Sequence, residues 1–205
     1  MSETVHLSTE LTADITMRPF SLDDAGALAE AYRRNREHLA PWEPVRPDEF
    51  FTARRQEALI AGKLQRLVDG SEVPWGLFDG GTVVGAVTLT GIIRGPFLSG
   101  DLGYWIDKDH TGQGLCTAAV AFVGGAARAM GLHRIQASTL LHNAASRKVL
   151  ARLGFTEIGV APEYLQIAGK WQDHMLHQLI LGDRKGNLPA DRSRNQSQDQ
   201  PGGSD

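Results

Sequence analysis

The twelve residues "DHTGQGLCTAAV" (Asp109–Val120) join an expected strand to an expected helix through two closely spaced glycines. The preceding "DLGYWI" (101–106) is typical of a strand, because it is short and rich in apolar and aromatic side chains. After the glycines, apolar residues recur at helical spacing in one continuous stripe. The pattern therefore predicts a helix that packs against a sheet, through Leu115, Ala118, Ala119, Phe122, Val123, Ala126 and Met130.

The start of this helix lacks a side-chain cap. No Ser, Thr, Asp or Asn stands at the natural cap position, so we expect the main-chain N–H groups of Gln113, Gly114, Leu115 and Cys116 to lack partners at the positive end of the helix dipole. Such a helix start binds anions, and a phosphate is the ligand that we expect there.

Two common phosphate-binding motifs do not fit this stretch. A P-loop requires a lysine after its second glycine, and Leu115 follows Gly114. A dinucleotide-binding turn requires a third glycine where Thr117 stands, and an acidic residue that the next expected strand, "RIQAS" (134–138), does not supply. On these residues alone, a glycine-rich connection without any ligand stays open.

Strands alternate with helices along the rest of the body. This alternation predicts an α/β (α+β) fold built around one sheet. The expected strands are 14–20, two runs within 74–93 joined by a turn at 79–81, 101–106, 133–141, 155–160 and 172–181. The expected helices are 21–39 with Ser21 as its N-cap, 49–70, the helix after Gly114, and 143–154.

Length and composition limit the class of protein. A chain of 205 residues suits one domain, which we place at 1–182, and the polar segment 183–205 is predicted to be a disordered tail. The single cysteine, Cys116, allows no internal disulfide and fits a reducing cytosol, and the N-terminus shows no secretory signal. A net charge of -3 argues against nucleic acid as the main partner, and we expect neither a membrane span nor a metal site.

Five stretches, in order along the chain, resemble the GNAT superfamily of N-acetyltransferases, and within it the RimJ/RimL branch of ribosomal-protein N-terminal acetyltransferases. The central stretch, "LGYWIDKDHTGQGLCTAAV" (102–120), contains a segment similar to the family's acetyl-coenzyme A signature, Q/R-x-x-G-x-G/A. Thr111 replaces the usual Gln or Arg and Cys116 the final Gly or Ala, at positions that the family uses mainly through main-chain N–H groups. The others are "MRPFSLDDA" (17–25), "NREHLAPWEP" (35–44), "HNAASRKVLARLGFTEIG" (142–159) and "WQDHMLHQLIL" (171–181).

The resemblance implies a single GNAT-type domain, with a mixed sheet of about seven strands that splays between the fourth and the fifth strand. Acetyl-coenzyme A would be the acyl donor, with its pyrophosphate on the bare helix start and its pantetheine arm in the gap between the splayed strands. The thioester carbonyl would meet an N–H near Ile106, which can stabilise a developing oxyanion. The residues implied in binding are Trp105, Ile106, Asp107, Thr111, Gly112, Gln113, Gly114, Leu115, Cys116, Thr117 and Asn143.

A second site is expected where Asn143 caps the helix 143–154, which Gly154 would end. Ser146 shares an apolar face with Val149 and Leu150, and a serine on such a face is unfavourable unless it is hydrogen-bonded. From the residues alone, Ser146 either completes the cap or takes part in chemistry. The resemblance implies that Asn143 contacts the pantetheine arm and that Ser146 is the general acid for the leaving thiolate.

The acceptor of the acetyl group is implied to be a primary amine, either a protein N-terminus or a small amine, and it must lose a proton during the reaction. Asp101, at the start of a strand, and Glu43, in "PWEP", are the candidate bases, and His142 is a third. The more rigid position favours Asp101 as the base and leaves Glu43 to attract the charged amine. Trp42 and Tyr164, with Glu43, are candidates for the acceptor site.

Two functions from different classes follow. The first is an enzyme that transfers the acetyl group directly in a ternary complex. We expect this enzyme in the cytoplasm, and a homodimer is one possible oligomeric state. The second is a non-catalytic acyl-coenzyme A binding module on the same fold, which stays open because the residues do not identify the base.

Overall fold

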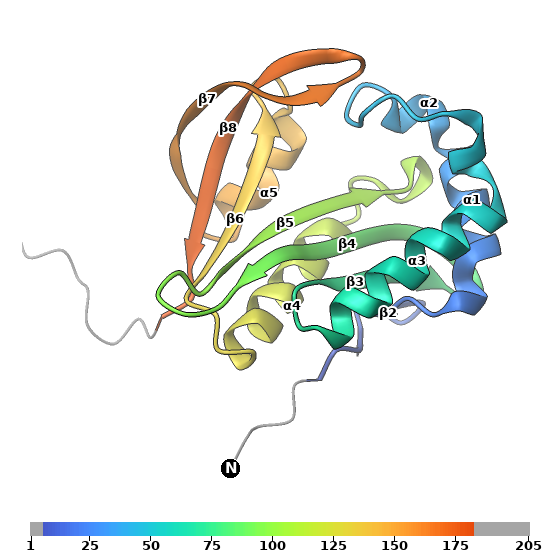
Figure 1. Cartoon of the computed structure of the whole chain (residues 1–205), viewed down its shortest axis with the longest axis horizontal. Helices are drawn as coiled ribbons and strands as arrows, with labels where there is room; N and C mark the ends of the chain where they lie inside the picture. The colour runs from blue at the N-terminus through green and yellow to red at the C-terminus, as the bar shows by residue number, and fades with distance from the viewer. Residues whose placement is uncertain (1–5, 183–205) are drawn as a thin grey trace, which may run out of the picture.

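A computed structural model describes residues 6–182, arranged around one mixed sheet with helices on both faces (Figure 1). The predicted tail, 183–205, lies outside the described residues, so the domain boundary at 182 stays a prediction. The strands are β1 (Thr9–Glu10), β2 (Ile15–Pro19), β3 (Val73–Asp79), β4 (Thr82–Ile93), β5 (Ser99–Ile106), β6 (Arg134–Leu140), β7 (Thr156–Ile167) and β8 (Lys170–Ile180). The helices are α1 (Ala25–Arg34), α2 (Arg36–Leu39), α3 (Ala53–Val68), α4 (Leu115–Ala129) and α5 (Ala144–Arg152), with short 3-10 turns η1 (Leu22–Asp24), η2 (Asp48–Phe51) and η3 (Lys108–His110).

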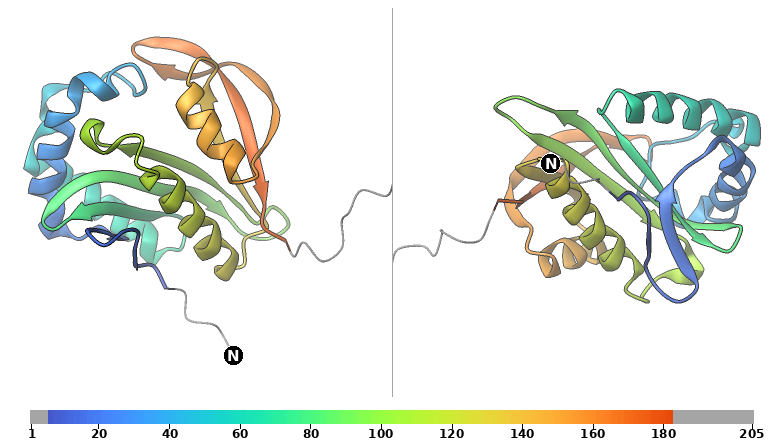
Figure 2. Two further views of the ribbon diagram at one scale, coloured as in Figure 1. Left: turned by 180° about the vertical axis from the view of Figure 1, so that it is seen from behind. Right: turned by 90° about the horizontal axis from the view of Figure 1, so that it is seen from below.

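Within residues 6–182, the sheet has eight strands in the order β1-β2-β3-β4-β5-β6-β8-β7, and among these only β5 and β6 run parallel to each other. Helices α4 and α5 cover one face, and α1 and α3 lie against the other face near β3 and β4 (Figure 2). The core divides in the same way: one apolar cluster lies under α4 and includes Leu115 and Val123, and a second includes Phe20, Leu28 and Ile60 beneath α1 and α3.

The sheet is splayed between β5 and β6, as the family resemblance implies. Pairing between these strands covers only 99–102 of β5 against 134–137 of β6, and beyond these residues the strands diverge (Figure 1). Each strand keeps its other neighbour: β5 stays paired with β4 up to Ile106, and β6 with β8 up to Leu140. The divergence therefore opens one edge of β5 without unravelling the sheet.

Three details differ from the sequence prediction, and one of them is that the single helix predicted over 49–70 is instead η2 followed by α3. The sheet gains an eighth strand because Thr9–Glu10 pairs with β2, outside the stretch predicted to be extended. The single helix predicted over 21–39 is instead η1, α1 and α2, interrupted at Asn35. Asn35 is fully buried, and its side-chain amide donates to the Asp107 carboxylate, 72 positions away, so the residue serves a tertiary contact that periodicity does not reveal.

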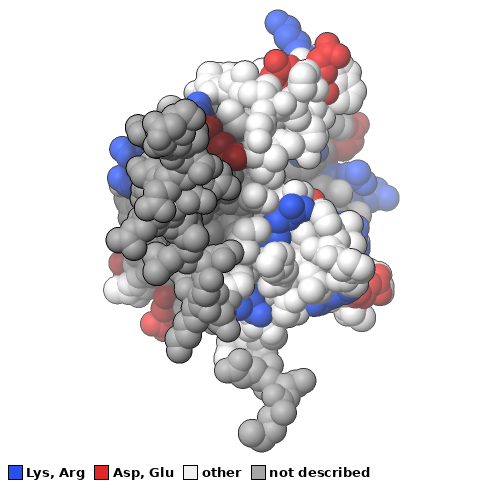
Figure 3. All heavy atoms as spheres, turned by 90° about the vertical axis from the view of Figure 1, so that its left-hand side faces the viewer, with Lys and Arg blue, Asp and Glu red and all other residues white. Residues whose placement is uncertain are grey.

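Charged side chains are distributed without a dominant area on the visible surface. On the face shown in Figure 3, basic and acidic groups of the described residues form small separate patches of both signs. No helix among residues 6–182 has the length and apolar character needed to cross a membrane. The same part of the chain contains no group of three or more His, Cys, Asp or Glu side chains arranged to hold a metal ion.

Candidate active site

The loop before α4 presents a bare helix start. Gly112 and Gly114 have φ angles of 76° and 80°, in the left-handed region that favours glycine. Gly114 is the N-cap, and the first helical hydrogen bond runs from the Ala118 N–H to the Gly114 carbonyl. Within the described residues, the N–H groups of Leu115, Cys116 and Thr117 therefore have no acceptor, and no acidic side chain occupies the first turn. This geometry fits a phosphate, and the anion site itself stays a prediction.

A buried ion pair fixes the position of this loop. Asp107 is 1% exposed, and its carboxylate accepts from Arg34 Nε at 2.8 Å and Asn35 Nδ2 at 2.7 Å. It also accepts from the Asp109 N–H at 2.9 Å, while Asn35 Oδ1 accepts from the Lys108 N–H at 2.9 Å. Burial opposes ionisation, but the hydrogen bonds from Asn35, Asp109 and Arg34 outweigh it and lower the pKa of Asp107. The end of α1 thus holds the segment that leads to the phosphate loop.

The open edge of β5 exposes main-chain groups at alternate residues. The Asp107 N–H donates to the Val84 carbonyl at 2.9 Å, and Trp105 lies opposite Ala86 in the same ladder. Because an antiparallel ladder alternates, the main-chain groups of Tyr104 and Ile106 point away from β4, toward the gap. The main-chain groups of Ile106 are therefore free for a ligand in the gap, whereas those of Trp105 and Asp107 face β4. The roles that the resemblance implies for these three residues in binding stay a prediction.

The remaining members of the predicted loop set lie on the loop as expected. Thr111 Oγ1 donates to the Lys108 carbonyl, and Gln113 Nε2 donates to the Asp109 carbonyl, so both side chains brace the turn and leave their N–H groups out of those bonds. Leu115 is buried in the core. The side chains of Thr111 and Gln113 thus shape the loop, and the main-chain N–H groups at the start of α4 lack acceptors within the described residues.

Helix α5 brings Ser146 to the splayed half of β5. Asn143 caps the helix by accepting from the Ser146 N–H at 3.1 Å, and Gly154, with a φ of 82°, ends it as predicted. The hydroxyl of Ser146 does not complete the cap. It lies 2.7 Å from the hydroxyl of Tyr104, which projects from β5 toward α4 and α5. A hydrogen bond between strand and helix therefore satisfies the serine.

The surroundings of this pair are apolar. Burial is the main cause that raises the pKa of Tyr104, and the nearby Cys116 thiol adds to it. Burial also raises the pKa of Cys116 to about 12. At neutral pH the phenol and the thiol therefore both keep their protons, so Cys116 is not a ready nucleophile.

The two candidate bases have different environments. Asp101 lies on the still-paired part of β5, exposed, and accepts from Gln136 Nε2 at 3.2 Å. Glu43 lines a pocket of about 220 Å³ enclosed by the end of α1, α2, the following loop and η2. Burial raises the pKa of Glu43, and only the side chain of Arg46, with Nε 3.5 Å from Oε2, opposes that shift.

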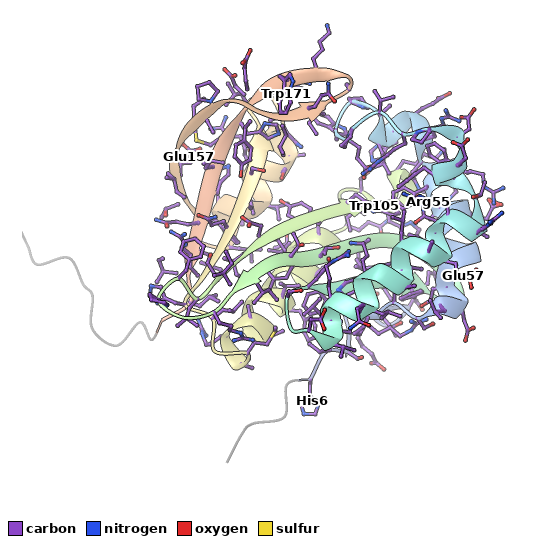
Figure 4. The ribbon with its side chains drawn as sticks, in the orientation of Figure 1. His6, Arg55, Glu57, Trp105, Glu157 and Trp171 are labelled. Carbon is purple, nitrogen blue, oxygen red and sulfur yellow. The ribbon has the colours of Figure 1, made fainter. Side chains whose placement is uncertain are left out.

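Tyr32 connects the Glu43 pocket to β5. Its ring lines the pocket and lies 5.1 Å from the ring of Trp105, whose Nε1 donates to the Tyr32 hydroxyl at 3.2 Å. Figure 4 shows Trp105 near the end of β5, on the side of α1. The pocket therefore approaches β5 from the face opposite to Tyr104 and Ser146.

The loop between α2 and η2, which carries Glu43, also contacts the segments after β6 and after β7. The rings of Trp42 and His142 lie 5.5 Å apart, and the Ala168 N–H donates to the Glu43 carbonyl at 3.0 Å. Beyond this contact lies a more open hollow of about 560 Å³, lined by His142, Lys170 and Trp171, the last at the tip of the β7–β8 hairpin (Figure 4). Tyr164 lies on β7 beside His174 and lines neither of these two cavities.

Sequence reasoning missed three residues that organise the site: Tyr104, Tyr32 and Asn35. The alternation of β5 contained the signal for Tyr104, because it places Tyr104 and Leu102 on the helix-covered face and Trp105 on the other. No comparable signal marked Tyr32 or Asn35, which contact residues 73 and 72 positions away.

Comparison with known proteins agrees with this geometry. Residues 14–156 match the family described as "Acetyltransferase (GNAT) domain". The ribosomal protein uS5-alanine N-acetyltransferase of Escherichia coli (strain K12) is 37% identical over 166 residues, which are 78% of this chain and 84% of that protein. The crystal structure of ribosomal-protein-S5-alanine acetyltransferase from Vibrio fischeri superposes with a TM-score of 0.83 at 34% identity, covering 87% of this chain and 98% of that one.

A second solved structure bears on the acyl donor. Mycobacterium smegmatis RimJ in complex with CoA-disulfide has a TM-score of 0.77 and 31% identity, and covers 81% of each chain. These relatives favour the catalytic function over a binding module, and the bare helix start beside the open edge of β5 fits acetyl-coenzyme A as the acyl donor. By sequence and by fold, the chain belongs to the GNAT family of acetyltransferases and is an N-acetyltransferase that uses acetyl-coenzyme A.

Proposed function

We propose that the acceptor is the N-terminal amine of a protein, of the ribosomal-protein class named for the relatives. The observation that carries this proposal is the partly buried carboxylate of Glu43 in a pocket that reaches β5 through Tyr32, with an open hollow beside it. The pocket has room for one small terminal residue, and the hollow has room for the residues that follow. The cytoplasm is the corresponding location, and a homodimer stays a prediction that sedimentation can test.

The donor side follows from the open edge of β5. The N–H groups at the start of α4 would hold the pyrophosphate of acetyl-coenzyme A, and the pantetheine arm would lie along the edge that β6 leaves open. The Ile106 N–H, directed into this gap, would then donate to the thioester oxygen as negative charge develops on it. Asn143, which follows the end of β6 and is fixed by its bond to the Ser146 N–H, is proposed to contact the arm.

Ser146 is proposed as the general acid for the leaving sulfur. Its position supports this role, because its hydroxyl is held on the helix-covered face of β5 by Tyr104. Removal of such a group lowers a rate by about 100-fold or more.

Glu43 is the stronger proposal for the base. A base works best when its pKa lies near the operating pH, and burial moves the pKa of Glu43 upward from the ordinary carboxyl value. Asp101 is exposed and accepts a hydrogen bond from Gln136, so its carboxylate remains in contact with water. This environment reverses the preference that strand rigidity alone suggests.

A peptide panel tests the acceptor. With acetyl-coenzyme A, we expect thiol release and a mass gain of one acetyl group for short peptides with a free N-terminal alanine. The matched control is the same sequence with a blocked N-terminus and an internal lysine, which should remain unmodified. Acetylation of the lysine alone, or of free small amines in preference to the peptides, would contradict the proposal.

Paired carboxylate variants test the base. We expect Glu43→Gln to lower kcat by about 100-fold and to remove the acid limb of the pH–rate profile, since the glutamine cannot accept a proton. Asp101→Asn is the matched control, and it should keep both turnover and the acid limb. The affinity for acetyl-coenzyme A should remain unchanged in both. Loss of the acid limb in Asp101→Asn but not in Glu43→Gln would assign the base to Asp101.

A further inference from the structure

The Tyr104–Ser146 pair has a defined hydrogen-bond direction. A phenol is a better donor than an aliphatic alcohol, because its proton is more acidic, and the alcohol oxygen is the better acceptor. At an oxygen–oxygen distance of 2.7 Å, the favourable arrangement is donation from Tyr104 to Ser146 Oγ. Ser146 then accepts one bond and keeps its own proton free for another partner.

The same direction persists over the working pH range. Burial among the residues of α4 and β5 raises the pKa of Tyr104, so the phenol stays protonated and remains a donor. Tyr104 can therefore orient the serine hydroxyl without losing a proton itself.

We propose that Tyr104 is a positioning residue, which donates to Ser146 Oγ and thereby directs the serine proton toward the departing sulfur of coenzyme A. The inference rests on the proposed role of Ser146 as general acid. In the transfer, the new bond from the amine nitrogen to the acetyl carbon forms, and the carbon–sulfur bond breaks with its electron pair on sulfur. The nitrogen gives its proton to Glu43, the sulfur takes its proton from Ser146, and solvent then removes the proton from Glu43 and restores the proton of Ser146.

The position of the pair explains why a tyrosine is suited to this task. Residues 104 and 146 are 42 positions apart, and the side chain of Tyr104 spans from the open half of β5 to the first turn of α5. A rigid aromatic ring packed on the core allows little freedom to the hydroxyl that it carries. The phenol thus fixes the rotamer of Ser146 beside the part of β5 that diverges from β6.

A double-mutant cycle with Tyr104→Phe and Ser146→Ala tests the proposal. Phenylalanine keeps the ring and removes only the donor, so we expect kcat to fall about tenfold, the size of one hydrogen bond, with KM for acetyl-coenzyme A changed less than about twofold. Ser146→Ala should lower kcat by about 100-fold. The double variant should equal Ser146→Ala, because Tyr104 acts only through the serine.

The matched control is Thr139→Val, which removes a buried hydroxyl that is 3.1 Å from His177 on β8 and leaves the volume almost unchanged. We expect Thr139→Val to lose stability as Tyr104→Phe does, but to keep kcat. Rates are compared with saturating acetyl-coenzyme A, which holds each variant in the folded state by mass action. Equal changes of kcat in Tyr104→Phe and Thr139→Val would overturn the inference. So would a kcat in the double variant that falls by the product of the two single losses.

The cycle also separates this inference from the role of Ser146. Full turnover in Ser146→Ala would disprove the general acid and, with it, the reason for positioning. A large loss in Ser146→Ala together with unchanged kcat in Tyr104→Phe would leave the general acid in place and reject Tyr104 alone.

Discussion

Gly114→Glu is expected to weaken acetyl-coenzyme A binding by about 100-fold or more. The substitution places a carboxylate at the N-cap of α4, where the pyrophosphate would lie, and placing like charges together costs several kcal/mol. The φ of 80° at Gly114 adds strain of about 1–2 kcal/mol for any side chain. Calorimetric titration measures the affinity directly, and thermal unfolding with and without the ligand gives an independent value.

Gly131→Glu provides the matched control. Gly131 follows the other end of α4, has a φ of 77°, and, like Gly114, has no atom within 4 Å of an added Cβ. It therefore shares the backbone strain and the added charge, but lies at the end of the helix that does not attract anions. We expect Gly131→Glu to bind acetyl-coenzyme A with the parent affinity. Equal affinity in both variants would show that the pyrophosphate lies elsewhere.

Asp107→Asn is expected to lower the free energy of unfolding by about 3 kcal/mol at pH 7. Removing one partner of a buried ion pair typically costs about 3–5 kcal/mol, and the lower end applies because the side chain of Arg34 remains 33% exposed to water. The amide also presents N–H groups to the donors Arg34 and Asn35. Denaturant unfolding of both proteins measures the difference.

The difference in unfolding free energy between the parent protein and Asp107→Asn should depend on pH with a definite sign. The pKa of Asp107 is lower in the folded state than in the unfolded chain, so its contribution to stability is fully present above the unfolded pKa. It is lost as the pH falls through the folded pKa, because both states then carry the proton. The difference in unfolding free energy between the parent protein and Asp107→Asn should therefore become smaller as the pH falls. A difference that does not change with pH would contradict the ionic role of Asp107.

Asp24→Asn separates loss of stability from loss of function. Asp24 forms a two-point ion pair with Arg18, at 2.8 Å for each bond, far from the phosphate loop in the sequence. Both variants should lose stability, but only Asp107→Asn should weaken acetyl-coenzyme A binding. The reason is that the Asp109 N–H and, through Asn35, the Lys108 N–H are held by the Asp107 network.

Local features of the site could be read from the sequence because they involve neighbouring residues. Whether a helix start has a side-chain cap depends on residues within one helical turn. In the structure, Gly114 provides no side-chain cap for α4, and Asn143 caps α5. Residues 101–106 form a strand for a similar reason, since alternation of side chains is visible within six residues. The splay was a matter of resemblance, because nothing in the composition of β5 or β6 requires them to part.

The sequence by itself thus determined the class of the fold, the bare helix start and the helix that carries Ser146. Only the tertiary structure decided which side chains meet at these points: Tyr104 with Ser146, and Asn35 with Asp107. It also decided the character of Glu43, whose pKa rises because surrounding residues remove water from its carboxylate. The physical reason is that caps and periodicity act over a few residues, whereas burial and long-range hydrogen bonds depend on how the sheet and helices pack.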